Sequence, residues 1–326
     1  MPNPLRSIPF VLLILVMVSC NPNTPPLTPL PHTTPSLSEY ELAYYYAPVI
    51  YQGAASDQDY ITAVDFDGDW IGNNNWENQP IGDLSAYVYY SVVETETHWF
   101  IFYSLFHPRD YTAEHCEKSR GCHENDMESI QLAVFKDGSR YGRLQAMETL
   151  AHGDIYLYTA DPTVKAGYLR IFGPVQFEGE HPIIYVEPYG HGIHGHPIAL
   201  GPWKVVYRVG EEAQIPEDVN DSHVTYRLIS IYETLWAHRD EVGQGRAFDR
   251  LFNYRGSNLP ATLDGDNYKS DRANTPWGYS QAIGKVLRRG DWFLDPARAF
   301  AYHATFEGEF STRYLYNPYL ADLGLP

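Results

Sequence analysis

The stretch Ala86–Phe106, AYVYYSVVETETHWFIFYSLF, contains two runs of aromatic and β-branched residues around the polar tetrapeptide Glu94–Thr97. Such residues are enriched in β-strands because they pack well on a pleated surface, and a short polar interruption is typical of a tight turn. We therefore predict a hairpin with strands at 86–94 and 98–106.

The rest of the chain repeats this pattern of short strands and turns. A second hairpin is predicted around Asp137-Gly138, a strong turn dipeptide. Its strands are expected at 128–135 and 140–150. Other expected elements are strands at 183–186 and 205–209, a helix or strand within 40–51, and helices around 230–239 and within 279–288. Aromatic-rich strands separated by Gly, Pro and Asn turns favour a mainly β fold, a single β-sandwich domain over 39–326 with peripheral helices and long loops.

Residues 1–20 have the pattern of an export signal. Their apolar run, 10–18, is shorter than the roughly 20 residues that a membrane-spanning helix requires. The segment ends in Met17-Val-Ser-Cys20, which resembles a bacterial lipobox and predicts lipidation of Cys20; an ordinary signal peptide with an incidental cysteine is the alternative. Residues 21–38 contain six prolines and no Asp, Glu, Lys or Arg, so we expect a semi-rigid tether.

These N-terminal features predict an exported lipoprotein of the bacterial cell envelope. Its partner there would be the membrane, reached through the N-terminal lipid, at the outer membrane or the cell surface. The formal net charge of −18 disfavours nucleic acid, which requires a basic surface. It also disfavours long-range attraction to anionic lipid, unless bound cations bridge the two surfaces.

The segment His107–Lys136, HPRDYTAEHCEKSRGCHENDMESIQLAVFK, carries side chains suited to metal binding. Asp110, His123, Asp126 and Glu128 offer three carboxylates and one imidazole, a set that favours Ca²⁺ or Mg²⁺ over zinc. Because side chains two residues apart share one face of a strand, Asp126 and Glu128 are expected to reach the same ion. His123 and Asp110 would complete the site from the loop, and the cation would relieve repulsion between the clustered carboxylates.

The chain has three cysteines. With Cys20 lipidated, Cys116 and Cys122 are expected to form a disulfide bond in an oxidising compartment, at the loop that leads into the metal motif. The alternative is a zinc site built from His115, Cys116, Cys122 and His123.

The same segment is similar to the necrosis- and ethylene-inducing peptide-like proteins. Their G-H-R-H-D-W-E heptapeptide aligns with Cys122–Glu128, CHENDME, and their preceding P-K-D-like turn aligns with Pro108-Arg109-Asp110. The resemblance implies a fold related to that of the cytolysins. It also implies that the divalent ion of that family would be held by Asp110, His123, Asp126 and Glu128.

Over most of 40–320 the chain resembles the uncharacterised vacuolar protein sorting 62-related family. The matching segments are Ala47–Tyr51, Val64–Trp70, Tyr189–Gly192 and Ala273–Gly278.

Two further groups of residues are candidate sites. His191, His194 and His196 lie in the Gly-rich segment GHGIHGH, where His191 resembles the position of a family histidine near the ion. The Asp-rich loops could hold a second ion, although neither has the EF-hand spacing and Asx turns are the alternative; they comprise Asp65, Asp67 and Asp69, and Asp264, Asp266 and Asp271.

The first functional hypothesis is a non-enzymatic, cation-dependent protein of the cell envelope that binds a glycan or a lipid headgroup, with Trp70, Trp76 or Trp99 available for stacking. The alternative is a metal-dependent hydrolase of ester or phosphodiester substrates, in which His107 or His191 moves the proton. A third is a metal that only stabilises the strand–loop junction. The sequence contains no nucleophile elbow, P-loop, dinucleotide fingerprint or H-E-x-x-H motif.

Overall fold

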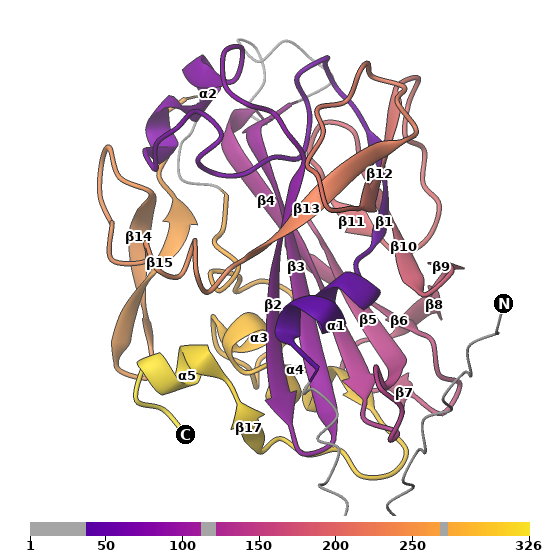
Figure 1. Cartoon of the computed structure of the whole chain (residues 1–326). Helices are drawn as coiled ribbons and strands as arrows, with labels where there is room; N and C mark the ends of the chain where they lie inside the picture. Colours follow the sequence, from indigo (N-terminus) through magenta and orange to yellow (C-terminus); the bar gives the residue numbers. More distant parts are fainter. Residues whose placement is uncertain (1–36, 112–121, 268–272) are drawn as a thin grey trace, which may run out of the picture. The chain divides into compact units, whose positions relative to one another are not determined.

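The computed structural model describes residues 37–111, 122–267 and 273–326 (Figure 1). Of these residues 39% are in strands and 11% in helices, so the prediction of a mainly β fold is confirmed. The strands are β1 (Val49–Gly53), β2 (Tyr87–Thr95), β3 (His98–Asp110), β4 (His123–Phe135), β5 (Arg143–Ala151), β6 (Asp154–Thr159), β7 (Lys165–Ala166), β8 (Ile171–Pro174), β9 (Phe177–Glu178), β10 (His181–Val186), β11 (Ile193–His194), β12 (Lys204–Val209), β13 (Val224–Ser230), β14 (Phe248–Tyr254), β15 (Ser257–Leu263), β16 (Ala304–Thr305) and β17 (Tyr314–Tyr316).

The helices are short and lie outside the sheet. They are α1 (Glu39–Tyr45), the 3₁₀ turn η1 (Gly72–Asn74), α2 (Asn75–Asn78), α3 (Asp291–Leu294), α4 (Pro296–His303) and α5 (Pro318–Asp322). Ser38 begins α1 with a capping box, because its hydroxyl accepts from the Glu41 N–H and the Glu41 carboxylate accepts from the Ser38 N–H.

Thirteen of the described strands form one curled sheet, in which the order along the main path is β11-β10-β1-β12-β13-β2-β3-β4-β5-β6-β8. Strand β13 pairs in parallel with both β12 and β2. It therefore links the strands on its two sides into one sheet, whereas β14–β15 and β16–β7 form two small separate sheets. The main body is thus one large curled sheet and not the predicted β-sandwich in clear form.

The central strands β3 and β4 are buried along nearly their whole length, because helices cover both faces of this part of the sheet. On one face, the Phe102 ring packs against Trp292 and Phe293 of α3 at centroid distances of 5.1 and 4.8 Å. On the opposite face, the Tyr103 hydroxyl donates to the Ala43 carbonyl of α1 at 2.6 Å. Apolar and aromatic residues on both strand faces are thus explained by burial on both sides.

The predicted strands are confirmed, whereas the helices predicted around 230–239 and within 279–288 are wrong. Residues 231–240 form successive turns after β13. Residues 279–288 contain Ala282 and Gly284 at φ values of 54° and 91°, which a right-handed helix excludes. The C-terminal helical residues lie further on, in α3 and α4.

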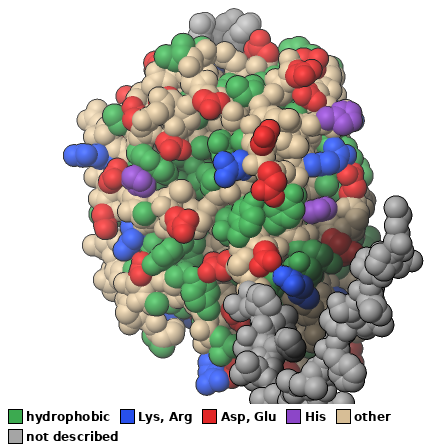
Figure 2. Space-filling model, viewed as in Figure 1, with side chains coloured by type: hydrophobic (Ala, Val, Ile, Leu, Met, Phe, Trp, Pro, Cys, Tyr) green, Lys and Arg blue, Asp and Glu red, His purple; other side chains and the backbone are tan. Residues whose placement is uncertain are grey.

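The acidic surplus is dispersed on the face shown in Figure 2, where Asp and Glu side chains alternate with Lys, Arg and apolar patches. Within the described residues, no helix combines the length and apolar character needed to cross a bilayer. The signal, the lipidated Cys20 and most of the tether, residues 1–36, lie outside the described part of the chain and stay predictions.

Candidate metal centre

The antiparallel pairing of β3 with β4 brings the predicted ligands together. Asp110 is the register partner of His123, and His107 is the partner of Asp126. The Nε2 atom of His123 lies 3.0 Å from an Asp110 carboxylate oxygen, which places two ligands at the open end of the hairpin. His123 is therefore the first residue of β4, and not a loop residue as expected.

The geometry of β4 explains how residues three apart reach one cavity. In a regular strand His123 and Asp126 would project to opposite faces. Asn125, between them, has a φ of 58° and so breaks the alternation. Its side chain is held in place: its Nδ2 donates to the carbonyls of Gly72 and Asp264 at 2.8 and 2.6 Å. Asparagine suits this position because it tolerates the left-handed conformation better than most residues.

All four predicted ligands line one cavity of about 400 Å³, which we call the acidic cavity. Its other lining residues are Tyr111, Met127, His152, Gly153, Gly190, Asn274, Tyr279 and Gln281. One oxygen each of Asp110 and Asp126 and a ring nitrogen of His191 lie within 4.8 Å of one another. The described part of the chain thus contains acidic and histidine groups that could hold a metal ion.

Two buried carboxylate oxygens in the acidic cavity, Oδ1 of Asp110 and Oε2 of Glu128, have no hydrogen-bond partner among the described residues. Burial and the neighbouring Asp126 carboxylate raise the pKa of Glu128 well above its usual value, and burial also raises that of Asp110. The Tyr279 hydroxyl, which lies beside Glu128, donates to the Met127 carbonyl. Orphaned oxygens with a disfavoured charge fit a hard divalent cation, which would supply the missing partner.

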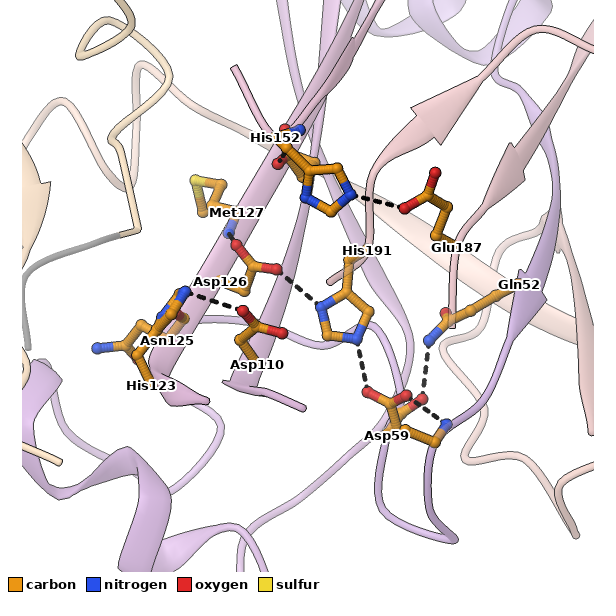
Figure 3. Close-up of polar contacts among 12 residues, drawn as sticks. Gln52, Asp59, Asp110, His123, Asn125, Asp126, Met127, His152, Glu187 and His191 are labelled. Atoms are coloured by element: carbon orange, nitrogen blue, oxygen red, sulfur yellow. Dashed lines mark hydrogen bonds and ion pairs between the residues drawn. The ribbon is translucent and has the colours of Figure 1, made fainter. Parts of the chain in front are cut away.

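His191 lies between Asp126 and Asp59 and contacts both carboxylates (Figure 3). Its Nδ1 lies 2.8 Å from Asp126 Oδ2, and its Nε2 lies 2.8 Å from Oδ1 of Asp59. Burial alone would lower the pKa of His191, but the two carboxylates raise it well above its usual value. Each ring nitrogen of His191 thus contacts a carboxylate, so an ion could bind this histidine only by displacing Asp59 or Asp126.

His107 is also withdrawn from the acidic cavity. Its ring stacks on His191 at 3.7 Å and 5°, and neither of its nitrogens has a hydrogen-bond partner among the described residues. Burial and the charge of His191 hold its pKa well below the usual value, so the ring is neutral. With His107 and His191 at 1% and 0% exposure, neither of the two candidate catalytic histidines lines the acidic cavity.

A histidine that the sequence did not single out lies at the rim instead. His152 and Gly153 form the two-residue turn between β5 and β6, with φ values of 55° and 108°, as a type I′ hairpin turn requires. The Nε2 atom of His152 lies 2.7 Å from Glu187, which also contacts His194 at 2.6 Å. These contacts lower the pKa of Glu187 to about 2 and raise that of His152.

Glycine at position 190 lets the β10–β11 loop pass close to the His152 ring, which a larger residue would displace. A Cβ atom at Gly190 would lie 2.6 Å from Cε1 of the His152 ring, closer than any real contact of this kind. The Gly-rich segment that suggested a histidine cluster therefore serves to pack a tight loop over the cavity rim. His196 points elsewhere, with its Nδ1 2.8 Å from the Tyr158 hydroxyl.

The remaining predicted groups are not brought to the acidic cavity. Trp70 stacks on His238, Trp76 lies under Arg109 and Trp99 is near Lys136 at the other end of β3, so none lines the cavity. In the Asp-rich loops, carboxylates accept local hydrogen bonds; Asp67 and Asp69 accept from side-chain and backbone groups, and Asp264 from Gly245 and Arg246. Among the described residues these loops form no group that could hold an ion.

Cys122 is buried and forms a disulfide bond. Its expected partner Cys116, as well as His115 and Asp271, lie outside the described residues, so the Cys116–Cys122 pairing stays a prediction.

No protein-family model matches the chain, and no curated protein matches it. Solved structures similar to it include necrosis and ethylene inducing protein 2 from the causal agent of cocoa's witches' broom disease, with 15% identity, a TM-score of 0.33 and coverage of 62% of this chain and 78% of that one. Another, described as a toxin fold for microbial attack and plant defense, has 17% identity, a TM-score of 0.35 and coverage of 61% and 76%. A third, NLPPya in complex with mannosamine, has 20% identity, a TM-score of 0.30 and coverage of 52% and 71%.

These structures belong to the family of the distant resemblance seen in the sequence. At TM-scores near 0.3 they support no conclusion about the activity of this chain, and the resemblance to vacuolar protein sorting 62-related proteins stays a prediction.

Proposed function

We propose that this protein binds a divalent cation, Ca²⁺ or Mg²⁺, through Asp110, His123, Asp126 and Glu128, and through the ion binds a polar ligand, a glycan or a lipid headgroup. The observation that carries the proposal is the pair of orphaned, buried carboxylate oxygens of Asp110 and Glu128 in one cavity. Burying such groups without a partner is costly, so the arrangement is best explained by a bound ion.

A polar ligand suits the rest of the acidic cavity. Side chains with hydrogen-bonding groups, Asn274, Gln281 and His152, line the wall around the carboxylates. A bound ion that keeps a coordination position for hydroxyl or phosphate oxygens would hold the ligand, and these side chains would orient it. Membrane anchoring through Cys20 would present the site at the envelope surface.

The test is a calorimetric titration of chelator-treated protein with Ca²⁺ and Mg²⁺. We expect stoichiometric binding of one ion per chain and proton release at neutral pH, because carboxyl groups with raised pKa values must ionise to bind the ion. Glycans and lipid headgroups are then screened with the ion and with chelator. Absence of ion binding by the folded protein, or ligand binding that ignores the chelator, would contradict the proposal.

The hydrolase alternative is favoured by one observation, the pairing of His152 with Glu187 at the cavity rim. A protonated imidazole placed there has the character of a general acid for a leaving group. Our proposal predicts no turnover of p-nitrophenyl esters or bis-p-nitrophenyl phosphate above buffer with Ca²⁺ or Mg²⁺. Turnover that is lost in both Glu128→Gln and His152→Ala would establish the enzyme instead.

A further inference from the structure

A second concave surface lies beside the acidic cavity. It has a volume of about 630 Å³ and runs along the β6–β8 edge of the sheet. We call it the aromatic groove; the lining residues used here are Asp154, Tyr156, Tyr168, Arg170, Phe172 and Ala282.

The aromatic groove and the acidic cavity share a wall. Gly153 and Gln281 line the cavity, and the residues that follow each of them, Asp154 and Ala282, line the groove. Gln281 packs directly on Gly153, where a Cβ atom would come within 2.0 Å of the Gln281 side-chain oxygen. A ligand that leaves the acidic cavity over this two-residue wall therefore enters the groove.

The groove also contacts the group formed by His152, His194 and Glu187 at the cavity rim. The Tyr156 ring lies 5.3 Å from His194, which shares the Glu187 carboxylate with His152. The two surfaces are thus linked by side-chain contacts as well as by the chain.

The chemistry of the groove matches a sugar ring. Phe172 and Tyr168 are 38% and 51% exposed, which is high for large aromatic rings, and Tyr156 meets Phe172 edge to face at 4.6 Å. The Arg170 guanidinium lies over one face of the Phe172 ring, 4.3 Å from its centroid. Tyr302 stacks on Tyr168 at a centroid distance of 4.8 Å, so a sugar would use the remaining faces of the Phe172 and Tyr168 rings. A pyranose has C–H groups on its faces and hydroxyls around its edge, so it needs an aromatic face bordered by donors and acceptors; Arg170 and Asp154 supply these.

We propose that the aromatic groove binds a second sugar unit of an oligosaccharide whose first unit occupies the acidic cavity. This inference rests on the proposed function and makes its ligand more specific: a glycan of at least two units, and not a single sugar or a lipid headgroup. The stacking surface expected from Trp70, Trp76 or Trp99 is supplied by Tyr156, Tyr168 and Phe172.

The test is the dependence of affinity on oligosaccharide length. The probes are linear series of one to six glucose, mannose, galactose or N-acetylglucosamine units, measured with Ca²⁺ and with chelator. We expect affinity to rise from one unit to two or three in at least one series. Phe172→Ala should remove this rise, a loss of roughly tenfold, and leave monosaccharide and ion binding unchanged.

One control variant and one further groove variant complete the test. Phe177→Ala removes an aromatic ring of similar exposure, 41%, that does not line the groove, and it should keep the rise. Arg170→Met keeps an unbranched side chain to pack over Phe172 but removes the donors, so it should lose part of the rise.

Affinity that is independent of length, a rise that survives Phe172→Ala, or no binding of any series would overturn the groove proposal. The proposed function has a separate readout. If the calorimetric titration shows no ion binding while a Phe172-dependent rise persists in chelator, the cation-dependent function fails and the groove stands.

Discussion

His191→Ala should destabilise the chelator-treated protein by about 3–5 kcal/mol, the usual cost of removing one partner from a buried ion pair. The substitution leaves the Asp59 and Asp126 carboxylates buried without the imidazolium that contacts both at 2.8 Å. Because the pKa of His191 is raised, its stabilising contribution is fully present below the unfolded value of 6.5. It is lost only as the pH rises through the higher folded value. Urea unfolding at neutral pH measures the effect.

Two control variants separate the stability lost with the charge of His191 from that lost through backbone strain or ring packing. His191 has a φ of 50°, so His191→Gly removes any strain that alanine introduces; it should still lose most of the stability if charge is the cause. His107→Phe keeps the stacked ring and removes two nitrogens that have no partner in the described structure, so it should change stability by less than about 1.5 kcal/mol. An His191→Ala variant within 1 kcal/mol of the wild type, again as an order-of-magnitude threshold, would refute the buried ion pair.

The sequence predicts that the four candidate ligands lie close together, and this grouping in one cavity is predictable because it is local. The turn and strand signals of β3 and β4 fix an antiparallel pair, and the pair alone brings Asp110 opposite His123. Residue types then indicate the chemistry, since three carboxylates and one imidazole so close together suit few purposes other than ion binding.

The supporting half could not be predicted because its contacts are distant in sequence. Asp59 contacts His191 across 132 positions, and its own loop, SDQDY, gives no sign of burial. Local pattern also cannot reveal that His191 is fully buried, so the sequence alone leaves it a candidate catalytic base. The left-handed conformation of Asn125 is equally hard to predict, because an Asn in a strand-like run gives only a weak signal for a positive φ. This residue turns His123 and Asp126 to one side.

The two halves of the site differ in charge balance. Carboxylates in the supporting half are compensated by a positive side chain, whereas those in the other half are not. Below the cavity floor, the imidazolium of His191 compensates Asp59 and Asp126. Above it, Asp110 and Glu128 have orphaned oxygens and raised pKa values, so without an ion these carboxyl groups hold a proton more readily than usual where the cation would bind. Ion binding and protonation should therefore compete at Glu128.

Glu128→Gln should reduce Ca²⁺ or Mg²⁺ affinity by roughly 100-fold or more, since the loss of even an outer-shell partner costs up to that much. It should also stabilise the ion-free protein at neutral pH. Because burial raises the pKa of Glu128, its contribution to wild-type stability is present below the unfolded value of 4.5 and is lost as the pH rises through the folded value. The neutral amide avoids that loss, and its oxygen can still accept from the His152 N–H as Glu128 Oε1 does at 3.2 Å.

The order of stability of Glu128→Gln and wild type should thus reverse between chelator and saturating Ca²⁺. Thermal unfolding from pH 4.5 to 8 under both conditions measures this. In chelator, the stability of Glu128→Gln relative to wild type should increase with pH; in Ca²⁺ the wild type should gain stability by mass action and the variant should not. Glu96→Gln, at an exposed carboxylate on the β2–β3 turn that contacts Arg313, should respond to Ca²⁺ as the wild type does. If Glu128→Gln loses stability in chelator at every pH, the carboxylate is a structural hydrogen-bonding group, and the cation-binding role assigned to it is wrong.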